Sequence, residues 1–158
     1  MKLILGPCQI EDRDMMLKIA EEIAIQTMHF EDQVYFKSSF DKANRSSASS
    51  KRGPGMEEGL RILEDIKNES QLPVLTDVHE CHQVKPVAEV VDVIQIPAFL
   101  SRQTDLITTA WQSGKIVNVK KGQFMAPMDV ENIIHKCQDY AGQSNSDRVW
   151  ITERGVTH

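Results

Sequence analysis

The chain has 158 residues, of which 41% are apolar and 26% are charged, and its formal net charge at pH 7 is −5. This length and composition are typical of one soluble globular domain with a real core. The negative charge argues against nucleic acid or an anionic membrane as the main partner, because both select a basic face. Any basic site must therefore be local.

The cysteines and the N-terminus indicate a cytoplasmic protein. Cys8, Cys81 and Cys137 are odd in number and form no CxxC pair, which favours a reducing compartment over a disulfide framework. The apolar run before Gly6 and Pro7 is too short for a signal peptide, and no later run approaches the roughly 18 apolar residues of a membrane span. We expect Cys81 and Cys137 to be packed or half-exposed helix residues.

Short apolar runs alternate with helical patterns along the chain. The expected strands cover residues 3–5, 34–37, 73–76, 90–96, 115–119 and 148–152. The expected helices cover residues 11–28, 56–67, 81–89, 104–113 and 128–140. The first strand is expected to be buried, Pro86 to lie in the first turn of its helix or break it, and Gly114 to end the fourth helix. A polar connection, GQSNSD, precedes the last strand.

The alternation predicts an α/β fold with parallel strands in one domain, residues 1–158. About six βα units are present, two fewer than a closed (β/α)8 barrel needs. An open sheet of this kind would expose its strand edges. The chain is then a piece of a longer protein, a partner in an assembly that completes it, or a degraded gene product.

Polar side chains lie at or just after the end of each predicted strand, where α/β folds bind ligands. These residues are Cys8; Lys37, Lys42, Asn44 and Arg45; Asp77 and His79; Gln95 and Arg102; Lys120, Lys121 and Gln123; and Glu153 and Arg154. Cations outnumber carboxylates among them, which favours a ligand with several anionic groups over a solvated surface. The same imbalance favours charge stabilisation over paired-carboxylate hydrolysis. No Walker loop, Rossmann fingerprint or GxSxG elbow is present.

Cys8 has two interpretations on the residues alone. A lone cysteine is more often a small buried hydrophobic residue, whereas a thiolate at a strand end can also bind zinc or ferrous iron.

Several long motifs carry a resemblance to a known family. In chain order they are GPC, FKSSFDKANRSS, RGPG, TDVHE, DVIQIPAFLSRQTDL, NVKKGQF and ERG. Over practically its whole length the chain resembles the 3-deoxy-D-manno-octulosonate 8-phosphate synthases. The resemblance implies a TIM-type (β/α)8 barrel that condenses phosphoenolpyruvate with D-arabinose 5-phosphate and releases phosphate, for lipopolysaccharide biosynthesis. The sister family that makes 3-deoxy-D-arabino-heptulosonate 7-phosphate has a similar barrel, but KANRSS and IPAFLxRQTD favour the octulosonate enzyme.

The resemblance also implies roles for individual residues. Lys42, Lys120 and Arg154 would hold the carboxylate and phosphate of phosphoenolpyruvate, with Lys37, Gln95, Gln123 and the backbone of Ala98 in the same substrate site. The pentose-phosphate side would contain Asn44, Arg45 and Ser46. The residues implied near the reacting carbons are Asp77 and His79, and those implied to reach a neighbouring subunit of a homotetramer are Phe99 and Arg102.

The position of Cys8 matches the cysteine of metal-dependent family members, which implies a divalent metal, zinc or iron or else manganese, and no organic cofactor. The family's other ligands, a histidine, a glutamate and an aspartate, would lie beyond this chain. After ERG the family continues, whereas this chain ends at His158. A non-catalytic fragment that keeps anion binding or subunit contacts is therefore the alternative to an active synthase.

Overall fold

The computed structural model of the chain describes residues 2–30, 33–141 and 146–157. Strands alternate with helices, and all the strand pairs whose registers are described are parallel, as the sequence predicted. Among the helices in these ranges, none combines the length and hydropathy needed to span a bilayer.

The chain divides into two compact units. The first unit contains Met1–Thr76 and Val90–Asp92, and the second contains Asp77–Glu89 and Val93–His158. The single domain over residues 1–158 stays a prediction, and we describe each unit by itself.

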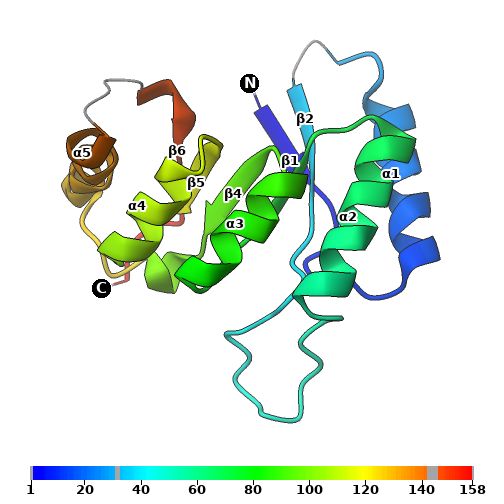
Figure 1. The fold of residues 1–158 in the computed structure, drawn as a ribbon, viewed down its shortest axis with the longest axis horizontal. Coiled ribbons are helices and arrows are strands. Elements are labelled where there is room, and N and C mark those ends of the chain that lie inside the picture. Colours follow the sequence, from blue (N-terminus) through cyan, green and yellow to red (C-terminus); the bar gives the residue numbers. More distant parts are fainter. Residues whose placement is uncertain (1, 31–32, 142–145, 158) are drawn as a thin grey trace. The chain divides into compact units, whose positions relative to one another are not determined.

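The first unit is a parallel sheet with helices on it. Its strands are β1 Lys2–Leu5, β2 Gln33–Lys37 and β3 Val74–Asp77, and they lie in the order β1-β2-β3. The last residue of β3, Asp77, belongs to the second unit. Two helices, α1 Arg13–Thr27 and α2 Met56–Ser70, lie side by side (Figure 1). The chain between β2 and α2 projects beyond the carboxyl end of β2.

Local sequence explains where α1 begins and how it meets α2. The Asp12 carboxylate accepts a hydrogen bond from the Met15 amide at 3.0 Å, which satisfies one of the unpaired amides of the first turn. Arg13 then reaches across to Asp65 of α2 at 2.7 Å. Both helices bury apolar side chains, because Met16 of α1 and Leu63 and Ile66 of α2 are fully buried.

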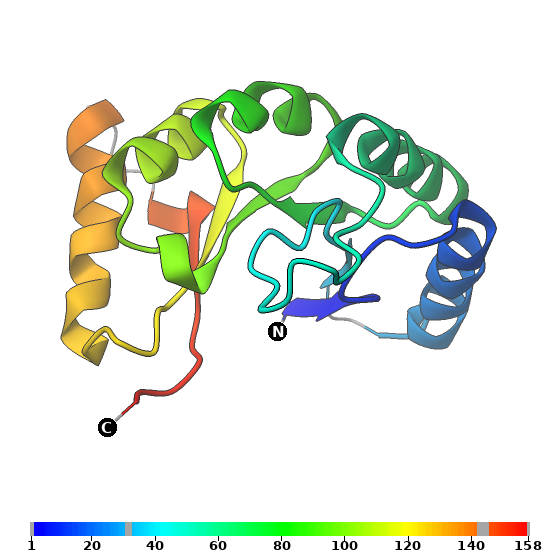
Figure 2. The ribbon, with the colours of Figure 1, turned by 90° about the horizontal axis from the view of Figure 1, so that it is seen from below.

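The second unit repeats the pattern with strands in the order β4-β5-β6. Its strands are β4 Val93–Ile96, β5 Ile116–Lys120 and β6 Val149–Thr152. Its α-helices are α3 Cys81–Val90, α4 Thr104–Gln112 and α5 Val130–Ala141, and its 3-10 turns are Ala98–Leu100, Pro127–Asp129 and Ser146–Arg148. Figure 2 shows α5 running beside α4, and it shows the chain after β6 leaving the sheet beside the loop that joins β5 to α5.

A buried tryptophan links α4 to β6 in the second unit. Trp111 is 1% exposed, and the Arg148 guanidinium stacks 3.8 Å from its ring centroid. Arg148 also donates to the carbonyl of Lys115 at 3.2 Å. A cation–π contact of this kind contributes about 0.5–2 kcal/mol. It fixes the start of β6 against the end of α4.

Three expectations about the elements were wrong. The first strand is largely exposed, because β1 lies at an edge and pairs with β2 alone within the described residues. Residues 90–92 are not part of β4, because Val90 ends α3 and the Asp92 carboxylate accepts from Lys67 and from the Val74 amide. Pro86 lies inside α3 without breaking it, and the turn that loses a hydrogen bond there is exposed to water.

The remaining expectations agree with the structure to within a few residues. Gly114 follows α4 with φ +81°, and its amide donates to the Trp111 carbonyl, as expected for a residue that ends a helix. The polar connection GQSNSD falls largely outside the described residues.

Candidate active site

Short hydrogen bonds tie together the carboxyl ends of the three strands of the first unit. The Ser38 hydroxyl donates to the Pro7 carbonyl at 2.9 Å, and the Thr76 hydroxyl donates to the Ser38 carbonyl at 2.7 Å. Gly6 permits this approach, because its φ is +139° and a Cβ there would lie 2.2 Å from the Lys37 carbonyl oxygen. The backbone that presents Lys37 is therefore fixed.

Lys37 is the last residue of β2 and is half-buried. Its ammonium donates to the Ser39 hydroxyl at 2.7 Å. Ser39 is fully buried and forms an isolated parallel bridge with Gln9. The first predicted cation is thus held at the end of its strand by a buried hydroxyl.

The loop that carries Lys42 is closed at its base by backbone and ionic contacts. The Lys42 amide donates to the Arg52 carbonyl at 2.6 Å, and the Arg52 guanidinium makes two hydrogen bonds to Asp41, at 2.8 and 2.5 Å. The side chain of Arg52 is 60% exposed, so this pair is accessible to solvent. At the other end of the loop, Gly59 of α2 fits closely against Phe40, because a Cβ at Gly59 would lie 2.4 Å from the Phe40 Cβ.

The predicted sugar-phosphate residues Asn44, Arg45 and Ser46 are all exposed in this loop. Arg45 donates to the Gln9 side chain at 2.8 Å and to the Lys51 carbonyl at 3.2 Å. Gln9 is 8% exposed, and sequence reasoning did not single it out. The feature of the sequence that could have identified Gln9 is its place directly after the GPC motif.

Cys8 is exposed and follows β1. Within the described ranges, no group of three or more histidine, cysteine, aspartate or glutamate side chains is arranged to hold a metal ion. One thiolate does not make a metal site, so these residues do not by themselves fit the expected metal.

In the second unit, Asp77 and His79 form a pair. His79 Nε2 lies 3.2 Å from Asp77 Oδ2, and the two side chains are only 15% and 8% exposed. The His79 amide donates to the Gln83 side chain at 2.7 Å, which anchors the turn. A carboxylate beside an imidazole can orient the ring.

A ladder of polar side chains crosses the three strands of the second unit. The Asn118 amide donates to Gln95 Oε1 at 3.3 Å, and the Thr152 hydroxyl donates to Asn118 Oδ1 at 2.9 Å. Gln95 and Asn118 are 3% and 1% exposed. The ladder fixes the predicted site residue Gln95. Asn118, a polar residue in an apolar strand, is the member that sequence reasoning missed.

The two consecutive lysines at the end of β5 have different environments. Lys120 is half-buried, whereas the Lys121 side chain is fully buried and its ammonium lies among backbone carbonyls. Lys121 was one of the polar residues that the sequence places after the predicted strands, and its burial leaves Lys120 as the more accessible of the two lysines.

Gln123 and Arg154 lie on neighbouring segments of the second unit, and both are exposed. The Thr157 amide donates to the Gln123 carbonyl at 2.9 Å, which joins the loop after β5 to the chain after β6. Next to Arg154, Glu153 accepts from the Gly155 amide at 2.6 Å. Desolvation opposes ionisation of Glu153, but hydrogen bonds from the Gly155 amide, Lys121 and the Arg154 amide hold the pKa of its carboxyl below the ordinary value.

The residues expected near a subunit contact lie after β4. Ala98 is buried, and its carbonyl accepts from the Ser101 hydroxyl at 2.8 Å. Phe99 is 68% exposed and Arg102 is also exposed. The carbonyl of Arg102 accepts from Lys136 of α5 at 3.0 Å. The turn therefore presents an aromatic ring and a guanidinium at the surface.

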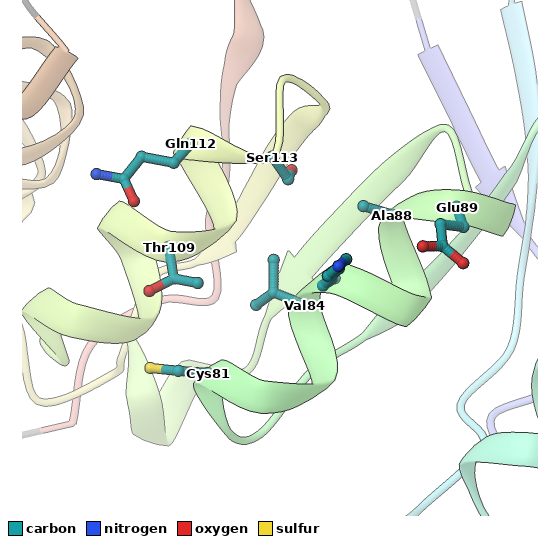
Figure 3. A pocket seen from close by; sticks show the side chains of 8 residues that line it. Cys81, Val84, Ala88, Glu89, Thr109, Gln112 and Ser113 are labelled. Carbon is teal, nitrogen blue, oxygen red and sulfur yellow. The ribbon is translucent and has the colours of Figure 1, made fainter.

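A groove of about 430 Å³ lies between α3 and α4 (Figure 3). It is lined by Cys81, Val84, Lys85, Ala88, Glu89, Thr109, Gln112 and Ser113. None of the predicted site residues lines it. Cys81 is exposed there, whereas Cys137 is fully buried in α5, which agrees with the expected helix positions of both.

Parallel βα units of this kind define an α/β protein of the TIM-barrel class, and the chain contains part of such a barrel. The chain belongs to the DAHP synthetase I family, whose model matches residues 1–158.

Curated relatives match almost the whole chain and share one name. The chain is 50% identical over 155 residues to the 2-dehydro-3-deoxyphosphooctonate aldolase of Geobacter sulfurreducens, covering 98% of this chain and 56% of the relative. It is 55% identical over 150 residues to the protein of the same name from Synechococcus sp., covering 95% and 51%. For the protein of that name from Cupriavidus taiwanensis the identity is 54% over 157 residues, covering 98% and 54%.

That name is a synonym of 3-deoxy-D-manno-octulosonate 8-phosphate synthase, so the resemblance drawn from the motifs is confirmed. The chain spans about half the length of the curated relatives it matches.

Proposed function

We propose that the protein containing this chain condenses phosphoenolpyruvate with D-arabinose 5-phosphate and water to give 3-deoxy-D-manno-octulosonate 8-phosphate and phosphate. The observation that carries the proposal is the placement of lysines on the last residues of strands, Lys37 on β2 and Lys120 on β5. Relatives at about half identity that bear the name of this enzyme support it. The reaction belongs to lipopolysaccharide biosynthesis.

The cations would first hold two polyanionic substrates together. At an effective dielectric near 20, repulsion between two anionic groups a few ångströms apart is of order several kcal/mol. Lys42, Lys120 and Arg154 would neutralise the carboxylate and phosphate of phosphoenolpyruvate. Asn44, Arg45 and Ser46 would bind the sugar phosphate, and their exposure in the loop after β2 leaves them accessible to it.

The chemistry then forms one carbon–carbon bond. The enolic carbon of phosphoenolpyruvate attacks the sugar aldehyde, whose oxygen takes a proton, while positive charge develops at the carbon bearing phosphate. Water adds to that carbon, and collapse of the adduct breaks the carbon–oxygen bond to release phosphate. We assign Asp77 and His79 to proton transfer near these carbons, because a buried carboxylate–imidazole pair can hold and move a proton.

A divalent metal would orient the aldehyde or the water. Cys8 would supply one ligand, and the others would come from outside this chain. If the proposal is right, Cys8→Asn in a completed barrel removes sensitivity to a chelator while the protein still folds. Unchanged chelator sensitivity would count against Cys8 as a ligand.

We also propose that the whole protein is a cytoplasmic homotetramer in which the turn Ala98–Leu100 and Arg102 approach a neighbouring subunit. The exposure of Phe99 supports a contact at this turn. Sedimentation velocity of the completed protein should give a tetramer, and Phe99→Ala should weaken it.

A phosphate-release assay with both substrates and added divalent metal tests the activity. Turnover by the 158-residue chain would exclude the alternative of a non-catalytic fragment. Absence of turnover with phosphoenolpyruvate binding retained, measured by calorimetry, would support that alternative for this chain. Lys120→Ala should reduce phosphoenolpyruvate binding at least tenfold, and the matched control Lys85→Ala, an exposed lysine on α3, should leave it unchanged.

A further inference from the structure

Lys121 is a charged side chain with no exposure to solvent. Burial of an ammonium is costly unless its donors are all satisfied. Its Nζ lies 2.7 Å from the Gly155 carbonyl and 3.3 Å from each of the Gly122 and Met125 carbonyls. An ammonium has three hydrogens to donate, and the three carbonyls share them with the Glu153 carboxylate, which lies 3.3 Å from Nζ. The group is therefore committed to contacts within the protein.

The acceptors of Lys121 lie on two different segments. Gly122 and Met125 belong to the loop after β5, whereas Gly155 lies after β6. The backbone reinforces the link, because the Lys121 amide donates to the Thr152 carbonyl at 2.9 Å. Figure 2 shows these two segments leaving the sheet together. A single buried ammonium thus crosslinks them.

The segment after β6 is also shaped around this ammonium. Glu153 lies 3.3 Å from Lys121 Nζ and accepts from the amides of Arg154 and Gly155, at 2.9 and 2.6 Å. Gly155 has φ +75°, a conformation that favours glycine, and its carbonyl makes the shortest contact with Nζ. The tight turn at 153–155 fixes the backbone from which the Arg154 side chain extends.

We propose that Lys121 is a positioning residue for anion binding: its buried ammonium fixes Lys120 and Arg154 relative to each other without contacting the ligand. The identity of the ligand, phosphoenolpyruvate, rests on the proposed function. The crosslink between the two segments rests on the contacts of Lys121 with Gly122, Met125 and Gly155. Displacement of a binding group by about 1 Å can cost about 100-fold in a catalysed reaction, so a fixed spacing between two cations matters as much as their charge.

The test compares Lys121→Met with Lys120→Met and Ile133→Ala. Lys121→Met keeps an unbranched side chain, shorter by the terminal atom, and removes its donors. Ile133, which is 2% exposed on α5, provides a control that destabilises the same unit away from the strand ends. Phosphoenolpyruvate binding to the 158-residue chain is measured by calorimetry well below every melting temperature. We expect the Kd to rise at least tenfold for Lys121→Met and less than twofold for Ile133→Ala.

The nuclear magnetic resonance signal of the Arg154 Nε–H group separates positioning from direct contact. In the ligand-free chain it should be one sharp resonance in the wild type, Ile133→Ala and Lys120→Met, and broadened or multiple in Lys121→Met. If Lys121→Met does not fold, Lys121→Gln, which keeps two donors, is measured in the same way and should show an intermediate effect.

A single sharp Arg154 resonance in the Lys121 variant, or a Kd no more affected than in Ile133→Ala, would overturn the proposal. Failure of the wild type to bind phosphoenolpyruvate would instead count against the proposed function for this chain. In that case the Arg154 resonance alone still decides whether Lys121 fixes this residue.

Discussion

The two units hold their strand-end residues in different ways. In the first unit, the loop that carries Lys42 and Arg45 is closed by contacts near solvent, such as that between Arg52 and Asp41. In the second, the segments that carry Lys120 and Arg154 are joined by a fully buried ammonium. Exposed ion pairs contribute about 0.2–1 kcal/mol each, whereas leaving a buried polar group without its partner costs about 1–3 kcal/mol, and more for a charged group. The contacts that close the first loop are therefore weaker than those that join the two segments of the second unit.

Thiol labelling offers the largest contrast between the units. Cys8 in the first unit is exposed, whereas Cys137 in the second is fully buried, and desolvation raises the pKa of its thiol to about 11. With a thiol reagent at pH 8, Cys8 and the exposed Cys81 should react at least about 1,000-fold faster than Cys137, because reaction there requires both opening and ionisation. In denaturant all three should react alike. Equal rates in the native protein would contradict the burial of Cys137.

Gly6→Ala should break the strand-end contacts of the first unit. A Cβ at this position would meet the Lys37 carbonyl oxygen at 2.2 Å with the backbone at φ +139°. The substitution should lower the free energy of unfolding by about 3 kcal/mol, measured by urea denaturation. Gly114→Ala is the matched control, because its φ is +81° but a Cβ there meets nothing within 4 Å, so about 1 kcal/mol is expected. Equal losses would show that the contact with Lys37 has no special weight.

Glu153→Gln should change how stability depends on pH. The pKa of Glu153 is lower in the folded chain than its ordinary value of about 4.5, because hydrogen bonds from Gly155, Lys121 and Arg154 outweigh desolvation. The stabilisation is therefore present above the ordinary pKa and is lost as pH falls through the lower folded value. Urea unfolding from pH 7 down to pH 3 should show a smaller loss of stability in the variant. Identical pH profiles would mean that the carboxylate is not stabilised by these donors.

Arg52→Ala should have the smallest effect. The Arg52 side chain is 60% exposed, so solvent screens its pair with Asp41 and the expected loss of unfolding free energy is about 0.5 kcal/mol. The loss should shrink further in 1 M salt, because screening weakens exposed pairs. A loss above about 2 kcal/mol that salt does not change would remove the contrast drawn between the two units.

The sequence was sufficient for the order and type of the elements but not for their environments. Apolar runs gave each strand to within a few residues, and glycine or proline directly closed two of them, residues 3–5 and 90–96. Residues 90–92 could not be separated from β4, because Val90 and Val91 continue the apolar run and the contact that ends it comes from Lys67, 25 residues away. The exposure of β1 could not be predicted, because it depends on which strands flank β1 in the sheet and not on the residues of β1 itself.

The same limit applies to the candidate site. Strand ends and the family motifs identified the cations, but two consecutive lysines look equivalent in a sequence. Alternation along β5 says that Lys120 and Lys121 face different ways without saying which one is buried. Asn118 and Gln9 were missed because a single polar residue in an apolar run, or beside a turn, has many explanations until its partner is known.

The edge position of β1 has a consequence for handling the chain in solution. Ile4 and Leu5 are 36% and 37% exposed, and within the described residues this strand pairs with β2 alone. An exposed strand edge with apolar side chains can pair with a strand of another molecule, and Lys2 is the one charged residue of β1 that opposes this. Self-association of the isolated chain should therefore grow with concentration. Binding experiments will be cleanest at low micromolar protein, where strand addition between molecules competes least with the ligand.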